Sequence, residues 1–467
     1  MLFNSTQFLV FFPIVLWLYF SLRHKGRLIL LLLASYYFYM CWQPKYVVLI
    51  LLSTAIDFAA GKWMGRLDTK KARKPILIFS LFVNLGLLFF FKYFNFFNEV
   101  LADLGAIFES PFSPSVHSLL LPVGISFYTF QTLSYSIDIY NGKIEPEKSF
   151  LKFAVFVSFF PQLVAGPIER AVNLLPQFSK TYDFDWKRIL DGLHLVLWGF
   201  FKKIVIADRL AVVVDTVYAS PESFAGPYLI LATYLFAFQI YCDFSGYSDI
   251  AIGTAKMMGY DLMTNFRTPY FSTSVREFWS RWHISLSTWF RDYVYIPLGG
   301  NRGSKFKAAR NILITFIVSG FWHGANWTFL IWGAIHGSCL LIERFATGFL
   351  KSVPTWMKWF ATFHVVLIAW IFFRANTVSD VGTIFCQLGT WSKLSAAEIH
   401  LTVFQFRILL TLLVAFIVAE VINYRFRISS SIIQLSFKAR FAVYFVLFVI
   451  VSLFGIWNSS SFIYFQF

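Results

Sequence analysis

The sequence predicts an all-α polytopic membrane protein, with about ten to twelve transmembrane helices and further re-entrant or interfacial helices. Hydrophobic residues make up 58% of the 467-residue chain, against roughly 45–50% in soluble domains. Charged residues make up only 14%, about half of the usual share. A water-soluble fold could not bury so much apolar surface, so we expect one domain over residues 1–467 embedded in the lipid bilayer.

Apolar runs recur along the whole chain, and a helix needs about 20 such residues to cross the hydrocarbon core. The runs lie near residues 5–22, 28–44, 46–61, 75–96, 118–137, 150–166, 190–217, 226–244, 311–343, 356–373, 402–422 and 440–457. We expect Lys202 and Lys203 to interrupt the run 190–217, giving two half-helices or an interfacial helix. The run 311–343 is too long for one span and contains Gly324, so we expect it to break into two pieces.

The charges of the loops predict the orientation of the chain. No basic residue precedes the first apolar run, whereas Arg23, Lys25 and Arg27 follow it, an order that does not fit a cleaved signal peptide. Residues 62–75 are strongly basic and should be cytoplasmic, whereas residues 97–117 carry acidic residues without Lys or Arg. The positive-inside rule therefore places the N-terminus outside the cytoplasm.

Charge and cysteine usage exclude other classes. The net charge of +16 does not indicate a nucleic-acid partner, because the basic residues fall in short clusters between apolar runs. The four cysteines form no CxxC pair, and no Cys/His cluster has the spacing of metal ligands. We therefore expect no metal site and no nucleic-acid partner.

Two polar stretches interrupt the apolar runs in the middle of the chain. In residues 158–170, SFFPQLVAGPIER, two prolines and a glycine should break a helix, either inside the protein or in a loop at the membrane surface. Residues 241–250, YCDFSGYSDI, place Asp243 and Asp249 beside an apolar run. Six residues give about 240° of helical rotation, so the two acids should not share a face. A structural Asp–Arg pair is favoured there over catalysis.

A third stretch, residues 276–302, interleaves arginines with tryptophans in REFWSRWHISLSTWFRDYVYIPLGGNR. This mixture is typical of a membrane interface, where rings lie at the headgroup level and guanidinium groups reach into water. We expect an amphipathic helix at or below the cytoplasmic surface, with His283 inside it. The stretch is either an anchor or a cationic wall for an anionic substrate such as a phosphate-bearing acyl carrier.

His323 lies in the middle of the apolar run, in SGFWHGANWTFLIWG over residues 319–333. Apolar surroundings disfavour the charged imidazolium, and a neutral imidazole is a general base near pH 7. Gly324 would allow close approach of another chain or a ligand, and Asn326 could orient or donate. His336 lies about 220° around an ideal helix, which disfavours a haem or metal pair. Either His323 is functional, or it is a buried ring hydrogen-bonded between helices.

These segments resemble the membrane-bound O-acyltransferase superfamily. The resemblance rests on YCDFSGYSDIAIG, NFRTPYF, REFWSRWHISLSTWFRDYVYIPLGGNRG and SGFWHGANWTFLIWGAIHG, with further similarity at LFNSTQFLVFFP, PVGISFYTFQTLSY, FFPQLVAGPIER and WIFFRA. It extends over nearly the whole chain and is most similar to the bacterial branch that O-acetylates alginate and related polysaccharides. Sister branches add D-alanine to teichoic acid or modify peptidoglycan.

The resemblance implies a ring of tilted helices around a central funnel that leads from the cytoplasm to an essential histidine. That histidine corresponds to His323, and the second motif histidine corresponds to His283. It implies no bound cofactor, a cytoplasmic donor substrate such as acetyl-CoA, and an SGNH-type acetyltransferase partner that places the acetyl group on an extracytoplasmic polysaccharide. It also implies a location in the bacterial cytoplasmic membrane.

The hypothesis is acetyl transfer with His323 as general base, assisted by His283, and with Asn326 or a backbone N–H near Gly324 stabilising the oxyanion. The residues expected to line the donor funnel are Asp243, Arg276, Arg281, Trp282, Ser285, Arg291 and Trp322. Broken helices and polar residues within the membrane are also typical of a transporter. A noncatalytic scaffold for the soluble acetyltransferase is a third class.

Overall fold

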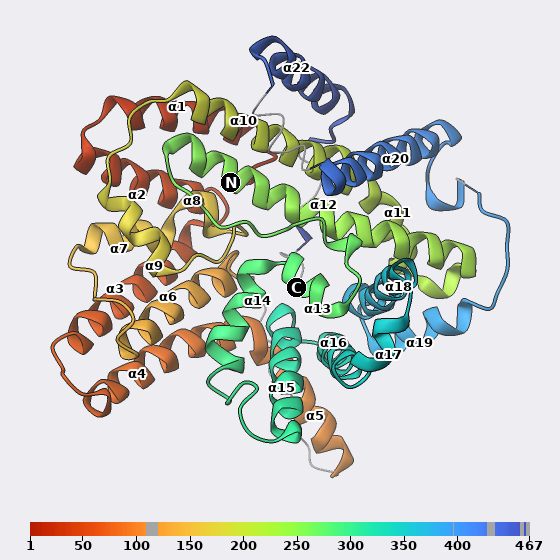
Figure 1. Ribbon diagram of the computed structural model, residues 1–467, viewed down its shortest axis with the longest axis horizontal. Coiled ribbons are helices and arrows are strands. Elements are labelled where there is room, and N and C mark those ends of the chain that lie inside the picture. The colour runs from red at the N-terminus through yellow and green to blue at the C-terminus, as the bar shows by residue number, and fades with distance from the viewer. Residues whose placement is uncertain (109–119, 396, 427–434, 458–461, 464–467) are drawn as a thin grey trace. The chain divides into compact units, whose positions relative to one another are not determined.

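The computed structural model describes residues 1–108, 120–395, 397–426, 435–457 and 462–463. Every regular element in these ranges is helical (Figure 1), which confirms the predicted all-α class. The chain divides into two compact units. Unit 1 comprises Met1–Gly192 and Thr254–Met263, and unit 2 comprises Leu193–Gly253 and Thr264–Phe467.

Unit 1 consists of the first nine α-helices with short 3₁₀ and π segments between them. The helices are α1 (Thr6–Ser21), α2 (His24–Met40), α3 (Val47–Met64), α4 (Lys70–Leu88), α5 (Phe94–Ile107), α6 (Ile125–Tyr140), α7 (Phe150–Ser158), α8 (Phe160–Leu163) and α9 (Ala171–Leu174). The 3₁₀ segments are η1 (Pro44–Tyr46) and η3 (Leu175–Ser179), and η2 (Phe89–Tyr93) is a π-helix. The helices begin where the sequence supplies caps, since the hydroxyl of Ser5 accepts from the Phe8 N–H and that of Thr69 accepts from the Ala72 N–H.

A buried carboxylate links three helices of unit 1. Asp57 of α3 accepts hydrogen bonds from Ser80 and Asn84 of α4 and from Ser136 of α6. A charge-bearing group inside an apolar helix is tolerated when its oxygens are hydrogen-bonded. The polar side chains therefore fix the positions of α3, α4 and α6 relative to one another.

The stretch 158–170 is broken and buried. Helix α7 ends at Ser158 and the four-residue α8 follows, as the prolines predicted. All residues from 153 to 170 are buried, so the break lies inside the protein and is not an exposed loop. Several polar groups are hydrogen-bonded inside unit 1: Gln131 and Gln162 both donate to the Phe156 carbonyl, and Glu169 accepts from the Met263 N–H.

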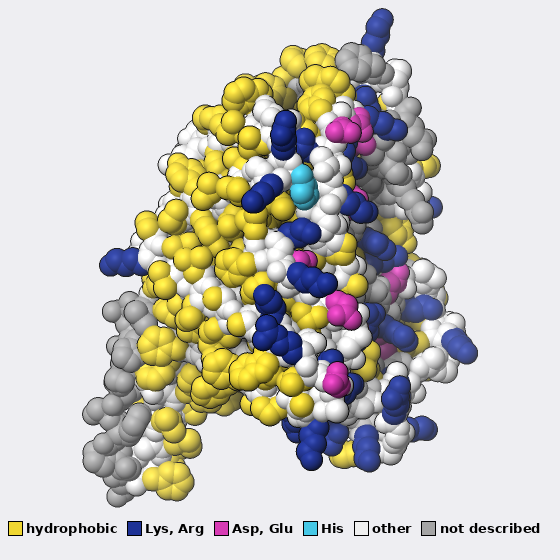
Figure 2. Space-filling model, turned by 90° about the vertical axis from the view of Figure 1, so that its left-hand side faces the viewer, with side chains coloured by type: hydrophobic (Ala, Val, Ile, Leu, Met, Phe, Trp, Pro, Cys, Tyr) yellow, Lys and Arg dark blue, Asp and Glu magenta, His cyan; other side chains and the backbone are white. Residues whose placement is uncertain are grey.

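The outer face of unit 1 is apolar. Figure 2 shows hydrophobic side chains over much of the left-hand part of the face that it presents, with Lys and Arg side chains spread over its middle and right-hand part. Exposed apolar residues on α1 to α4 include Trp17, Leu33, Leu51 and Phe82. Such a surface is stable against lipid chains and not against water, which agrees with a polytopic membrane protein.

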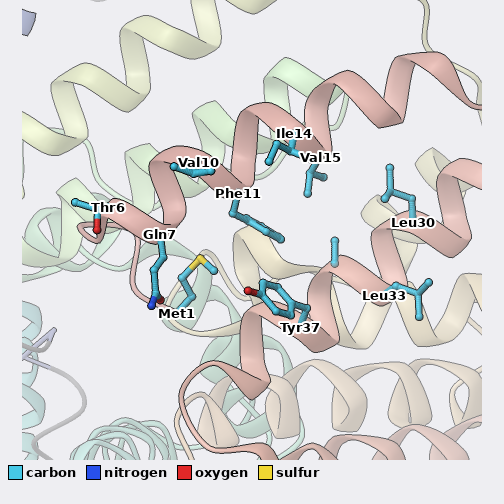
Figure 3. A pocket seen from close by; sticks show the side chains of 11 residues that line it. Met1, Thr6, Gln7, Val10, Phe11, Ile14, Val15, Leu30, Leu33 and Tyr37 are labelled. Atoms are coloured by element: carbon cyan, nitrogen blue, oxygen red, sulfur yellow. The ribbon is translucent and has the colours of Figure 1, made fainter.

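A groove of about 700 Å³ lies between α1 and α2. Figure 3 shows that its walls come from Val10, Phe11 and Ile14 on one helix and from Leu33 and Tyr37 on the other. Its lining is mostly apolar, and it contains none of the residues that the sequence predicts for the functional site.

Unit 2 contains most of the remaining helices. The elements that continue the chain are α10 (Trp186–Phe200), which begins in unit 1, the π-helix η4 (Phe201–Ala207), α11 (Asp208–Ala219), η5 (Pro221–Ser223) and α12 (Gly226–Met258), which ends in unit 1. They are followed by η6 (Pro269–Phe271), α13 (Val275–Arg281), α14 (Ile284–Phe290), the π-helix η7 (Arg291–Tyr295), α15 (Lys305–His323), α16 (Trp327–Phe345), α17 (Thr347–Ser352) and α18 (Thr355–Arg374). The last are α19 (Val378–Gln387), η8 (Ala397–Ile399), α20 (Val403–Phe426) and α22 (Phe437–Phe454).

Three expectations about the apolar runs can be compared with these bounds. The run 190–217 is not two separate half-helices, because the π-helix η4 joins α10 to α11 at Lys202 and Lys203. The run 311–343 does break in two, between His323 and Trp327. The stretch 276–302 is not one amphipathic helix, because it forms α13, α14 and η7.

Five helical segments of the described chain are long and apolar enough to cross a membrane. They are Pro44–Met64, Lys70–Ile107, Gly226–Met258, Thr355–Arg374 and Val403–Phe426. These spans support a multi-pass membrane protein. The total of ten to twelve crossings and the external N-terminus remain predictions.

Candidate functional site

The break between α15 and α16 positions His323. Helix α15 ends at His323, and Gly324 follows in an extended conformation. Gly324 is required because a Cβ atom there would lie 2.1 Å from the ring of Phe329. The Asn326 side chain then accepts from the Thr328 N–H and caps α16.

Helices α15 and α16 pack side by side (Figure 1) because glycine faces backbone at their contact. A Cβ atom on Gly320 would lie 2.1 Å from the Phe329 carbonyl oxygen, and one on Gly333 would lie 2.3 Å from that of Phe316. This close hairpin places His323 at its turn, inside unit 2.

Aromatic rings from three helices surround His323. Its ring lies 5.0 Å from Trp322 of α15, 5.1 Å from Trp332 of α16 and 5.3 Å from Phe373 of α18, centroid to centroid. His323 is only 3% exposed. His336 also packs against Trp332, with ring centroids 4.9 Å apart. The apolar environment predicted for His323 is therefore present.

His283 lies beside His323. Its ring centroid is 6.5 Å from that of His323, so the structure brings together the two histidines that the sequence singled out. His283 precedes α14 with φ of 42°, a left-handed conformation that is strained for a residue other than glycine. The ring of Phe244 from α12 packs on it edge to face at 4.5 Å. Burial lowers the pKa of His283 well below its ordinary value of 6.5, which keeps the imidazole neutral.

Asn265 connects His283 to the surrounding backbone, and the sequence analysis did not identify it. Its side-chain oxygen lies 3.1 Å from His283 Nδ1 and accepts from the Ser285 hydroxyl at 2.9 Å. Asn265 is 1% exposed. We call His283, His323, Asn265 and Ser285 the histidine site. The only sequence signal was the motif NFRTPYF, which gives no indication that its first residue would meet a histidine 18 positions further on.

The tryptophans and arginines expected at the funnel separate into two groups. Trp322 packs beside both histidines, since its ring centroid is 6.3 Å from that of His283 and 5.0 Å from that of His323. Trp282 is buried against Trp370, with ring centroids 5.0 Å apart. The arginines lie away from the core: Arg276 is exposed, Arg281 pairs with Glu277 at 2.6 Å, and the exposed Arg291 pairs with Asp292 at 2.7 Å.

Asp243 belongs to a buried group of ion pairs. It pairs with Lys203 at 2.6 Å, and Lys203 also pairs with Asp208 at 2.7 Å. The neighbouring Lys202 pairs with Asp249 at 2.7 Å. We call these five residues the ion cluster. The expected Asp–Arg pair was wrong, because both acids bind lysines, and the two acids point to different partners, as their spacing predicted.

Asn326 is engaged in local structure. Besides capping α16, its amide nitrogen donates to the Asn376 carbonyl at 2.7 Å. Both polar groups of this side chain therefore have partners that hold the turn after His323.

Two imidazoles side by side are groups that can accept and pass on a proton. The sequence profile of the membrane-bound O-acyltransferase family matches residues 147–378. The chain is 41% identical over 412 residues to the probable alginate O-acetylase AlgI of Pseudomonas aeruginosa, covering 85% of this chain and 78% of that protein.

Two further relatives are similar over most of their length. The probable alginate O-acetylase AlgI of Azotobacter vinelandii is 39% identical over 438 residues, covering 91% of this chain and 85% of the relative. The peptidoglycan O-acetyltransferase of Helicobacter pylori is 36% identical over 416 residues, covering 81% and 78%. The chain therefore belongs to the membrane-bound O-acyltransferase family, and it is an O-acyltransferase of the membrane.

Proposed function

We propose that this chain takes an acetyl group from a cytoplasmic thioester, acetyl-CoA, and passes it across the membrane for the O-acetylation of an extracytoplasmic polysaccharide such as alginate. The observation that carries the proposal is the buried pair His283 and His323, whose ring centroids are 6.5 Å apart within an aromatic shell. The two alginate O-acetylases among the relatives support the acetyl group and the acceptor.

The reaction is the transfer of acetyl from sulfur to oxygen. The acceptor hydroxyl attacks the thioester carbonyl while His323 takes its proton, a C–O bond forms, and the C–S bond breaks as the oxyanion collapses. The proton then passes from His323 to the leaving thiolate, which departs as the thiol. Atoms and charges balance without a further reactant.

Stabilisation of the oxyanion falls to the turn after His323. Asn326 was one candidate, but its amide nitrogen already donates to the Asn376 carbonyl. The Gly324 N–H donates to the Gly320 carbonyl at 3.4 Å, so we assign this role to the backbone N–H groups of Ala325 and Asn326. One general base contributes typically about 10²–10⁴-fold, so positioning of the two substrates supplies the rest of the rate.

We assign donor entry to the stretch 276–302. The exposed side chains of Arg276 and Arg291 suit the phosphates of an anionic carrier, and the buried Trp282 and Trp322 lead inward to the histidines. Asp243, Arg281 and Ser285 complete the walls in this proposal. No bound cofactor is needed, because acetyl-CoA is a substrate.

The acceptor and the partner follow from the same proposal. The whole chain forms one membrane domain in the bacterial cytoplasmic membrane with its N-terminus outside, and an extracytoplasmic SGNH-type acetyltransferase delivers the acetyl group to the polysaccharide. Peptidoglycan is the second candidate acceptor, because the Helicobacter pylori relative is a peptidoglycan O-acetyltransferase. D-Alanylation of teichoic acid is the less favoured use of the same fold.

The experiment is complementation of a strain from which the gene has been deleted, with mass spectrometry of alginate and peptidoglycan. We expect wild-type protein to restore acetyl groups on alginate and His323→Ala to restore none at equal expression. His364→Ala is the matched control, because this histidine of α18 bonds to Tyr234 and lies outside the histidine site. Full acetylation by the His323 variant would refute the assignment, and acetyl groups on peptidoglycan alone would change the acceptor. Solute flux without acetylation would identify the protein as a transporter. Unchanged turnover of acetyl-CoA by the His323→Ala variant would identify it as a noncatalytic scaffold.

A further inference from the structure

Asn265 is a buried side chain at the centre of a small hydrogen-bond network in unit 2. Its side-chain oxygen accepts from the Ser285 N–H at 3.2 Å and from the Ser285 hydroxyl at 2.9 Å. Its amide nitrogen donates to the Ser248 hydroxyl at 3.3 Å. Its own carbonyl accepts from the Ile284 N–H at 3.0 Å. One residue therefore holds the start of α14, directly after His283.

These contacts determine which end of the amide faces His283. A backbone N–H can only donate, so the side-chain atom that the Ser285 N–H approaches has to be the oxygen. The same oxygen lies 3.1 Å from His283 Nδ1. Because an amide oxygen only accepts, Nδ1 has to carry a proton and donate it.

The proton on Nδ1 determines the tautomer of the His283 ring. A neutral imidazole has one N–H and one lone pair. With the proton on Nδ1, the lone pair is on Nε2, at the edge of the ring directed away from Asn265. Burial disfavours the doubly protonated cation.

We propose that Asn265 is a positioning residue that locks His283 in the neutral Nδ1–H tautomer, so that Nε2 is held as a hydrogen-bond acceptor beside His323. The inference rests on the proposed function, in which both histidines serve acetyl transfer. His283 then orients the hydroxyl or the thiol through Nε2 while His323 moves the proton.

The amide explains why His283 keeps a constant charge. A carboxylate at this position would also accept from Nδ1, but its negative charge would favour the imidazolium. Among the residues that the structure describes, the rings of Phe244 of α12, Phe266, and Trp322 and His323 of α15 pack against it. Of these rings only the imidazole of His323 is an ionisable group that can bear a positive charge. Asp243, next to Phe244 on α12, is paired with Lys203.

The first test replaces the amide by a carboxylate of the same shape. For Asn265→Asp in purified protein we expect acetyl transfer, relative to wild type, to fall at least about tenfold between pH 9 and pH 6.5, because His283 becomes protonated as the pH falls. For Asn265→Leu we expect a loss of about 10–100-fold at every pH, with the larger change in kcat and a smaller one in KM. If the rate of Asn265→Asp relative to that of wild type is the same at every pH, the proposal is overturned.

The matched control is Asn311→Asp, a second buried asparagine of unit 2. Its amide nitrogen donates to the Gly300 carbonyl at 3.0 Å, and it has no assigned role in the reaction. We expect its pH profile to follow that of wild type. If Asn311→Asp loses activity at low pH as Asn265→Asp does, a buried charge alone explains the effect and the proposal is wrong.

The second test needs no activity, which separates this inference from the proposed function. In wild-type protein labelled with ¹⁵N-histidine, the signals of His283 are identified by their loss in His283→Gln. We expect a protonated Nδ1 and an unprotonated Nε2, and a shift toward the Nε2–H tautomer in Asn265→Leu. An Nε2–H tautomer in wild type would overturn the inference even if His323→Ala is inactive. The Nδ1–H tautomer together with an active His323→Ala would leave it standing and reject the proposed function.

Discussion

The histidine site and the ion cluster both bury ionisable side chains inside unit 2, but they treat charge in opposite ways. In the ion cluster Lys203 lies 2.6 Å from Asp243 and 2.7 Å from Asp208, so each buried charge lies beside an opposite charge. In the histidine site His283 and His323 are surrounded mainly by aromatic rings, and an amide holds one of them. Balanced charges fix structure, whereas uncharged imidazoles remain able to accept a proton.

The largest effect should come from removing the imidazole of His323. We expect His323→Ala to lower the rate of acetyl transfer about 10²–10⁴-fold and His283→Ala to lower it less. The double variant should be no slower than His323→Ala within about threefold, because residues that act as a unit are not additive. Steady-state rates with purified protein measure this, and fully multiplied losses would show that the two histidines act independently.

Replacing a lysine of the ion cluster should lower the stability of the folded protein. Lys203→Met leaves Asp208 and Asp243 without their shared cation, and breaking a buried pair in this way costs about 3–5 kcal/mol. The control is Lys256→Met, because Lys256 is partly exposed and lies 3.8 Å from Asp191, where a pair contributes about 1 kcal/mol or less. Thermal unfolding in detergent measures both. Equal effects of the two variants would contradict the structural role of the cluster.

A smaller effect should come from the cap at the turn after His323. Asn326→Ala removes the acceptor of the Thr328 N–H, which costs about 1 kcal/mol. Ser304→Ala removes the corresponding cap of α15, where the hydroxyl accepts from the Lys307 N–H, and should cost a similar amount. We expect only Asn326→Ala to slow acetyl transfer as well, by several-fold, because only that cap adjoins His323. If the two variants are equally active, the turn after His323 has no part in the reaction.

The last effect concerns the response of stability to pH. The pKa of His283 is well below 6.5 in the folded protein and near 6.5 in the unfolded chain. Below about pH 6.5 the unfolded chain therefore binds a proton that the folded protein does not, so stability falls as the pH falls, by up to about 1.4 kcal/mol per pH unit. His283→Gln should remove this part of the slope when melting at pH 5.5 and 7.5 is compared. An unchanged slope would mean that His283 does not contribute.

Local signals were enough to predict several features of this molecule. Gly324 and Asn326 in the run 311–343 predicted the break after His323, because an extended glycine and a capping asparagine act within a few residues. The prolines of 158–170 predicted the end of α7 in the same way. The family motifs indicated His283 and His323, and the structure places their rings side by side.

Features that depend on distant segments could not be predicted. The contact of Asn265 with His283 joins residues 18 positions apart across a turn whose φ of 42° at His283 no periodicity reveals. His283 also separates α13 from α14, so the stretch 276–302 does not form one amphipathic helix. The sequence showed that Asp243 and Asp249 needed basic partners, but which cations would reach them depended on the packing of η4 against α12.

The central claim is that the imidazole of His323 carries out acyl transfer. The most direct measurement is the release of free thiol from acetyl-CoA by purified protein in liposomes that contain an acceptor polysaccharide and the soluble acetyltransferase. The claim predicts thiol release by wild type and by His364→Ala, and at least about 100-fold less by His323→Ala. Undiminished thiol release by a correctly folded His323→Ala variant would contradict it.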